Sequence, residues 1–472
     1  MKIKQIPFLT SSIVFLLLIQ WACTPQTSQA PHSEAETAFT HVNVISMLSA
    51  QEGIQTEQTV RVIGEKIVEV GPSDQVKPSE HATIIDGSGK YLLPGLAEMH
   101  AHIPVPKEDS SIVEETLFLY LSNGITTIRG MLGDPFHLTL REQIASGVIL
   151  GPRMYTSGPS LNGGSVPDPE SAIQKVKAQK EAGYDFLKLH PGIKRAVFDS
   201  LVATAKAVDI PYAGHVSIDV GIRHAIASDY AAVDHLDGYL EGLVPKSAEI
   251  DPNENGFFGF NFTELVDLTK IAELSEATKD KNVWIVPTQS LLVRWTGIVP
   301  VAQTLSEPEM KYMSPITLDR WEASKNKMLE ALGDEAELVE KFINIRQQII
   351  QGLKAAGVDF LLGSDAPQIF NVPGFSIQHE MQSMVDAGLS PYEVLYSGTA
   401  NPARFFGDMG KYGTIVSGSS ADLILVNANP LDDISNMRNQ EGVMLRGTWL
   451  SKVMIQDRLA KIARKYADLA KN

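Results

Sequence analysis

The sequence predicts an α/β fold, a (β/α)8 barrel with a small β-sandwich domain built from both chain ends. Three observations support this. Residues 94–407 alternate short apolar runs with amphipathic stretches, polar residues recur where the apolar runs end, and short strand-like runs fill residues 38–93 and 408–456. The chain has 472 residues, of which 44% are hydrophobic. That is enough for one large core and a satellite domain.

The middle region contains eight strand-like runs separated by helical patterns. The predicted strands end at Met99, Ile128, Tyr155, Leu189, Gly214, Asp234, Val286 and Leu362. Amphipathic helices are predicted over Glu170–Ala182, Arg195–Ala207 and Leu338–Ala356. A doubly wound open sheet is the alternative arrangement. It gives no reason for polar residues of strands one, four, five, six and eight to converge, whereas a closed barrel does.

Two connections in the barrel region are too long to be simple turns. They span residues 238–262 and 290–337, and both follow predicted strands. Loops in that position lie over the carboxyl ends of barrel strands, where barrel chemistry takes place. We therefore expect both to cover the site.

The two ends of the chain resemble each other in pattern. Residues 59–70 alternate around Gly64 and predict a hairpin, and strand-like runs return at 421–426 and 443–455. Residues 457–472 follow as an amphipathic helix to which we assign no chemistry.

The amino terminus predicts export. Lys2 and Lys4 precede an apolar run at 13–19 that is too short to span a bilayer. Residues 1–22 are therefore predicted to be a signal peptide, and Cys23, the only cysteine, to be the lipid anchor of a bacterial lipoprotein. Residues 23–37 would be a polar tether. The predicted location is the bacterial cell envelope, and an ordinary secretory signal cut nearby is the alternative.

The formal net charge of −16 excludes nucleic acid as a partner, because no basic patch offsets it. A small-molecule substrate is expected, and contact with a membrane only through Cys23. The sequence does not predict an oligomeric state, and a homo-oligomer is left open.

The residues with the strongest chemical signal are histidines at strand ends. His100 and His102 are two apart on one strand and can point at the same ion. An inward-facing Lys188 in strand four would be costly to bury unless it is paired or modified. His215 and His235 directly follow predicted strands five and six, and Asp365 comes just after strand eight.

Taken singly, each residue has an ordinary structural reading: a buried histidine in the core, a helix-capping aspartate, or a lysine that reaches the surface. Six suitable types at six strand ends favour a metal site. Imidazole and carboxylate ligands without thiolates suit zinc, and also manganese, iron or cobalt.

Several longer motifs accompany these residues. They are Leu93-Pro-Gly-Leu before the two histidines, Asn123-Gly-Ile-Thr-Thr-Ile-Arg129, Ala387-Gly-Leu-Ser-Pro-Tyr-Glu-Val394, Thr399-Ala-Asn-Pro-Ala-Arg404 and Gly413-Thr-Ile-Val-Ser-Gly-Ser-Ser-Ala-Asp-Leu-Ile-Leu425. As a set they resemble the amidohydrolase superfamily. Within it the chain is similar to the imidazolonepropionase-related branch, which includes metal-dependent Xaa-Pro and Xaa-Arg dipeptidases.

The resemblance implies two divalent metal ions. It places His100, His102 and Asp365 on one ion, His215 and His235 on the other, and a carboxylated Lys188 between them. It also implies hydrolysis of an amide or peptide-like C–N bond, as in a dipeptide, an N-acyl amino acid or a cyclic amide. Asp365 would serve as the catalytic proton carrier.

Substrate contacts are less clearly marked. His190, two residues after Lys188, is a candidate, as are Arg129, Tyr155 and Ser217. Gly163-Gly164-Ser165 stands where dipeptidase-like relatives carry Gly-Gly-His, and Val216-Ser217 where they carry Ala-Tyr. These differences leave a standard dipeptidase specificity open.

Three alternatives remain at this stage. An esterase or lactonase would share all the ligands, a mononuclear imidazolone-type hydrolase would not need a modified Lys188, and a non-catalytic ligand-binding lipoprotein would need no reaction.

Overall fold

The computed structural model describes residues 35–106 and 111–471. The predicted signal peptide, Cys23 and most of the tether lie outside these residues. Only the end of the tether is described, and it differs from the prediction because β1 begins at Glu36. Arg61 of the neighbouring strand donates to the Glu36 carboxylate over 2.7 Å, which holds this polar residue in the ladder.

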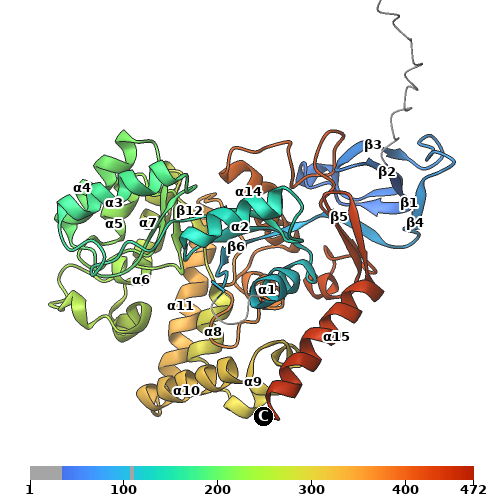
Figure 1. The fold of residues 1–472 in the computed structure, drawn as a ribbon. Coiled ribbons are helices and arrows are strands. Elements are labelled where there is room, and N and C mark those ends of the chain that lie inside the picture. Colours follow the sequence, from blue (N-terminus) through green and yellow to red (C-terminus); the bar gives the residue numbers. More distant parts are fainter. Residues whose placement is uncertain (1–34, 107–110, 472) are drawn as a thin grey trace, which may run out of the picture. The chain divides into compact units, whose positions relative to one another are not determined.

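One eight-stranded sheet contains strands from both ends of the chain (Figure 1). Its strands are β1 (Glu36–Val44), β2 (Gln55–Ile63), β3 (Lys66–Pro72), β4 (Thr83–Asp86), β5 (Tyr91–Pro94), β13 (Leu423–Val426), β14 (Gln440–Leu445) and β15 (Thr448–Ser451). The order is β15-β14-β13-β5-β1-β2-β3, with β4 beside β1. Where the two ends meet, β13 runs antiparallel to β5, and Leu423 lies opposite Pro94.

Parallel strands alternate with helices in the middle of the chain, which makes the fold α/β. A three-stranded sheet contains β6 (Leu96–Ala101), β7 (Ile125–Gly130) and β8 (Arg153–Thr156). A four-stranded sheet contains β9 (Leu187–Leu189), β10 (Tyr212–Gly214), β11 (Ala232–Asp234) and β12 (Trp284–Val286). Isolated parallel bridges join Ser157 to Phe186, Ile285 to Phe360 and Ala101 to Ala366.

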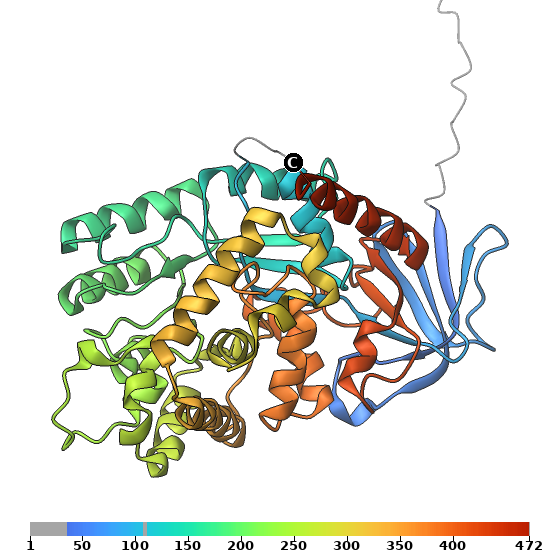
Figure 2. The same ribbon diagram turned by 90° about the horizontal axis from the view of Figure 1, so that it is seen from below.

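The helices lie between and around these strands (Figure 2). They are α1 (Ser111–Leu121), α2 (Pro135–Ala145), α3 (Pro169–Ala182), α4 (Arg195–Ala207), α5 (Ile222–Ala227), α6 (Tyr239–Gly242), α7 (Ile271–Asp280), α8 (Gln289–Thr296), α9 (Val301–Leu305), α10 (Pro315–Leu332), α11 (Ala336–Ala355), α12 (Ser376–Asp386), α13 (Pro391–Gly398), α14 (Ala400–Phe405) and α15 (Lys452–Leu469). Short 3-10 helices lie at Ala50–Glu52, Pro252–Glu254, Phe257–Leu265, Leu268–Lys270, Pro308–Tyr312 and Ile434–Arg438.

Local sequence explains where many helices begin and end. Asp168 caps the amino end of helix α3, because its side chain accepts from Ser171 N–H, and Pro169 is the first residue of the helix. It ends at Gly183, whose φ of 85° suits a residue without a Cβ. Helix α15 begins at Lys452, five residues before the predicted start, because Ser451 caps it. No helix among the described residues is long and apolar enough to cross a bilayer.

Candidate metal centre

A buried glutamate fixes the relation between β6 and the segment before Asp365. Glu98 Oε1 accepts His100 N–H over 3.0 Å and Ser364 N–H over 2.7 Å. Burial raises the pKa of Glu98 to about 8. Through this one carboxyl group, the backbone positions that carry His100 and Asp365 are held side by side.

His100, His102 and Asp365 converge as a result. Asp365 Oδ1 lies 2.7 Å from His102 Nε2 and 3.6 Å from His100 Nε2. Asp365 Oδ2 lies 3.8 Å from His235 Nδ1. A ring nitrogen of His100, a ring nitrogen of His235 and a carboxylate oxygen of Asp365 lie within 4.8 Å of one another. All three residues are buried. The structure therefore brings together ligand candidates from three distant parts of the chain.

The remaining histidines continue this cluster. The ring centroids of His100 and His235 are 4.6 Å apart, those of His235 and His215 are 4.6 Å apart, and those of His215 and His190 are 5.1 Å apart. His190 Nδ1 also lies 2.7 Å from Ser160 Oγ. Five imidazoles, including His102, form a continuous row at the ends of β6, β9, β10 and β11.

Lys188 lies within the same cluster but makes a contact that the sequence did not predict. Its Nζ donates to Asp234 Oδ2 over 3.3 Å, and both side chains are fully buried. Asp234 also faces His100 Nδ1 at 3.3 Å and accepts from Arg129 Nη2 over 2.8 Å. Asp234 therefore lies between two buried cations and one candidate ligand.

Three further residues that the sequence reasoning missed orient the histidines. Asp237 Oδ2 lies 2.9 Å from His215 Nδ1, and Thr288 Oγ1 lies 2.8 Å from His235 Nδ1. Arg346 of α11 donates to the His235 carbonyl over 2.9 Å. The contacts of Asp237 and Thr288 occupy Nδ1 of each imidazole and leave Nε2 free to bind an ion. For Asp237, the sequence Asp-His-Leu-Asp at 234–237 could have indicated a carboxylate close to the histidines.

The backbone is strained at three residues that carry or orient the ligand candidates. Asp365, His235 and Thr288 have φ values of 62°, 64° and 42°, in the left-handed region that such residues seldom adopt. Strain of this kind is retained where surrounding contacts force a side chain into one direction.

The charge states of these groups suit a cation. Burial holds the pKa values of His100 and His235 well below the usual range, so both imidazoles are neutral at pH 7. The pKa of Asp365 is lowered despite its burial, because His100 and His102 face it. Asp365 Oδ1 is buried without a hydrogen bond of suitable geometry among the described residues. Neutral imidazole nitrogens and an unsatisfied carboxylate oxygen that face one another fit a divalent metal ion.

The substrate-contact candidates lie in different places. Ser217 Oγ accepts Ile193 N–H over 3.0 Å, and the residue borders two cavities, of which the smaller is also bordered by His215. Arg129 is fully buried, and its Nε donates to Met99 O over 2.6 Å in addition to the Nη2 bond to Asp234, while Nη1 has no hydrogen-bond partner among the described residues. Tyr155 stacks on Phe406, and its hydroxyl bonds to Asp408. Neither arrangement favours a substrate contact by Arg129 or Tyr155.

A cavity of about 290 Å³ lies beside His215 and is also bordered by Asp237 and Phe258. The Phe258 ring lies over two imidazoles, with its centroid 6.0 Å from that of His215 and 5.5 Å from that of His235. Phe257 packs against Trp295 at 4.7 Å. The connection at 238–262 thus reaches the histidine row through Phe258, and the connection at 290–337 contacts Phe257 through Trp295.

The model of the family described as "Amidohydrolase family" matches residues 91–450, a span that holds every ligand candidate. The chain belongs to the amidohydrolase family.

Two solved structures resemble this amidohydrolase at low sequence identity. The structure described as bottromycin amidohydrolase superposes with a TM-score of 0.68 at 21% identity, over 90% of each chain. A Xaa-Pro dipeptidase with bound methionine gives a TM-score of 0.62 at 19% identity, over 88% of this chain and all of the other. At such identities the likeness shows the fold alone. Adenine deaminase 2 of Shouchella clausii (strain KSM-K16) is 41% identical over 64 residues, and this match spans 13% of the chain and 10% of the relative.

Proposed function

We propose that the chain is a metal-dependent amidohydrolase that cleaves an amide or peptide-like C–N bond in a dipeptide, an N-acyl amino acid or a cyclic amide. One observation carries the proposal. Buried ligand atoms of His100, His235 and Asp365, from three separate segments of the chain, lie within 4.8 Å of one another. Membership of the amidohydrolase family supports it.

The proposed cofactor is a pair of divalent ions, with zinc the best match to the ligands. His100, His102 and Asp365 would hold one ion, and His215 and His235 the other. Lys188 would bridge them after carboxylation. Burial lowers the pKa of Lys188, which increases the neutral amine that reacts with carbon dioxide. A carboxylated side chain would also remove the cost of a buried ammonium.

The ions would supply an activated water near neutral pH and polarise the substrate carbonyl. Side chains of the protein would transfer the proton of the attacking water. Asp365 is ionised and buried, so it can accept the proton of the attacking water on one oxygen and deliver it to the leaving nitrogen. Asp237 and Thr288 keep His215 and His235 in fixed orientations, and Phe258 shields the imidazoles from bulk water.

We also propose that the strands close into a (β/α)8 barrel. The isolated bridges and the bond from Met99 N–H to Leu362 O place residues 359–366 between β12 and β6. The segment would be the eighth strand, interrupted by turns at Asp365. The small β-sandwich domain, the lipid anchor at Cys23 and the envelope location remain proposals from the sequence.

Metal analysis of the purified chain, combined with a substrate panel, tests the function. The panel contains dipeptides, N-acyl amino acids, cyclic amides, lactones and adenine, the last because of the local match to adenine deaminase 2. We expect two ions per chain, amide hydrolysis that stops on chelation, and at least about 10³-fold lower kcat for Asp365→Asn. Asp386→Asn, on the exposed surface of α12, is the matched control.

Other outcomes distinguish the alternatives. One ion per chain with an unmodified Lys188 would favour a mononuclear hydrolase. Turnover of lactones but not amides would favour an esterase. A chain that binds no metal at all would contradict the proposal.

A further inference from the structure

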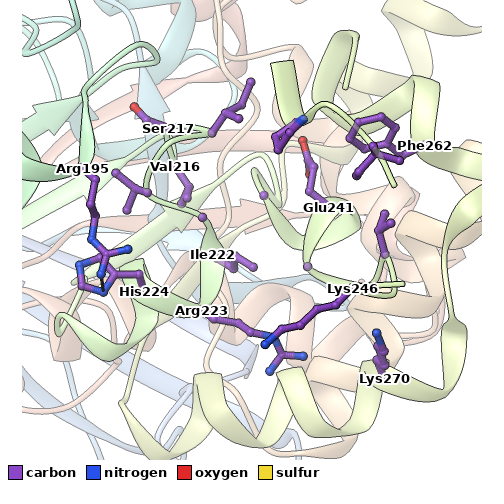
Figure 3. Close-up of a pocket in the computed structure, with 18 of the residues that line it drawn as sticks. Arg195, Val216, Ser217, Ile222, Arg223, His224, Glu241, Lys246, Phe262 and Lys270 are labelled. Carbon is purple, nitrogen blue, oxygen red and sulfur yellow. Dashed lines mark hydrogen bonds between the residues drawn. The ribbon is translucent and has the colours of Figure 1, made fainter. Parts of the chain in front are cut away.

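A second, larger cavity is bordered by none of the five histidines of the row. It measures about 800 Å³ and is bordered by the beginning of α4, by α5 and α6, and by Lys270 and Glu273 at the start of α7 (Figure 3). Such a volume lies within the range of cavities that take small organic ligands. Val216 and Ser217 border both this cavity and the smaller one beside His215.

One part of the wall is apolar. Val216, Ile222 and Phe262 are buried side chains that face the cavity, and Val244 and Ile250 add half-buried apolar surface. These residues come from three separate segments of the chain. An apolar surface of this kind binds the hydrocarbon part of a ligand.

Another part of the wall is cationic. Arg223, Lys246 and Lys270 border the cavity and are labelled in Figure 3 along the same side of it. Arg223 pairs with Glu273 at 2.8 Å. Lys246 and Lys270 form no ion pair or side-chain hydrogen bond with any other residue in the described part of the chain. Among these described residues neither ammonium group is held in an ion pair, although Asp267 interacts electrostatically with Lys270, and both stand next to apolar surface in a chain whose net charge is −16.

The acidic residues on the wall do not cancel these charges. Glu241 Oε1 accepts from Asn255 Nδ2 over 2.7 Å, and Figure 3 shows its carboxyl group at the opposite side of the view from Arg223 and Lys270. Glu273 is engaged by Arg223. The unpaired charge at the cavity is thus positive.

We propose that this cavity is a binding site for a carboxylate that carries an apolar chain, separate from the metal centre. The carboxylate would lie between Lys246 and Lys270, and the chain would pack on Ile222, Phe262 and Val216. The proposal does not depend on the proposed hydrolysis, because none of these residues is a ligand candidate.

Calorimetric titration of the full-length chain with decanoate tests it. We expect one decanoate per chain, and binding at least about tenfold weaker for acetate, which lacks the apolar chain, and for decylamine, which lacks the anion. Lys246→Ala combined with Lys270→Ala should weaken decanoate binding about tenfold. The matched control is Lys175→Ala with Lys177→Ala, two exposed lysines of α3 outside the cavity.

Two more variants locate the ligand. Val244→Trp should fill the cavity and abolish binding while an unchanged unfolding curve shows that the chain is folded. Asp365→Asn should leave decanoate binding unchanged. Equal binding of decylamine, or decanoate binding that is lost in Asp365→Asn but unaffected by removal of the two lysines, would overturn the proposal.

Discussion

Arg129 and Asp234 form a fully buried ion pair, with Nη2 and Oδ1 2.8 Å apart, next to Lys188 and His100. Asp234 is the only carboxylate within 4 Å of either cation among the residues that the structure describes. Its charge therefore balances two buried positive groups at once.

Replacing Asp234 should destabilise the fold rather than only slow the reaction. Asp234→Asn would leave the Arg129 guanidinium uncompensated in the interior, at a cost of about 3–5 kcal/mol. Urea unfolding monitored by circular dichroism measures this free energy. Asp199→Asn, an exposed partner of Arg195, is the control and should change it by less than about 1 kcal/mol. Equal stability of the two variants would contradict the structural role of Asp234.

Asp237→Asn should weaken metal binding while the fold is retained. Without this carboxylate, His215 loses the partner at 2.9 Å that fixes its ring. A fall in metal affinity of about 10–100-fold is expected, measured by competition with a chromogenic chelator. Asp219→Asn, which borders the same small cavity but pairs with Lys194, should leave the affinity unchanged. This prediction rests on the proposed function.

A glycine is required at position 214, because the Lys188 side chain lies against the backbone of β10 there. A Cβ at Gly214 would lie 2.5 Å from Leu189 O and 2.8 Å from Lys188 Cδ, and the φ of 125° is unsuitable for other residues. Gly214→Ala should therefore lower the free energy of unfolding by about 3 kcal/mol or more. Gly183→Ala is the matched control, since it has a φ of 85° and open space around it, and should cost about 1 kcal/mol. If both variants lost a similar free energy of unfolding, backbone strain alone would explain the effect, and the predicted clash with Lys188 and Leu189 would be wrong.

Glu241 should make stability depend on pH. Burial, with a contribution from Asp237, raises the pKa of Glu241 from 4.5 to about 7. The folded chain then binds more protons than the unfolded chain between these values, so this residue's contribution to stability falls as pH rises from about 4.5 to 7. Glu241→Gln should match the parent at pH 4.5 and exceed it by about 1–2 kcal/mol at pH 8. Unfolding curves across this range test the prediction, and parallel curves for the two proteins would contradict it.

The strand ends that carry the ligands could be predicted from the sequence because apolar runs and turn residues mark them locally. β9, β10, β11 and β12 end at the predicted residues Leu189, Gly214, Asp234 and Val286. The predicted helix over 195–207 coincides with α4. These features depend on neighbouring residues only.

The partners of buried charges could not be predicted in the same way. Arg129 was expected to contact substrate, but its partner Asp234 comes from β11, far along the chain. Tyr155 lies near the end of β8 as expected, yet its hydroxyl bonds to Asp408, whose position depends on the whole fold. Phe258 itself has a φ of 51°, and its ring lies beside His235. No sequence pattern indicates this unusual backbone conformation.

The pairing of β5 with β13 has a consequence for how the chain acquires its structure. During synthesis, β5 emerges long before residues 423–426 exist, so one of its edges stays unpaired while the ligand-bearing strands are made. Contacts between residues so far apart form late and slowly. A ribosome-bound chain that stops short of residue 423 should therefore expose the Tyr91–Pro94 edge, and folding of this sheet must wait until residues 423–426 have been made.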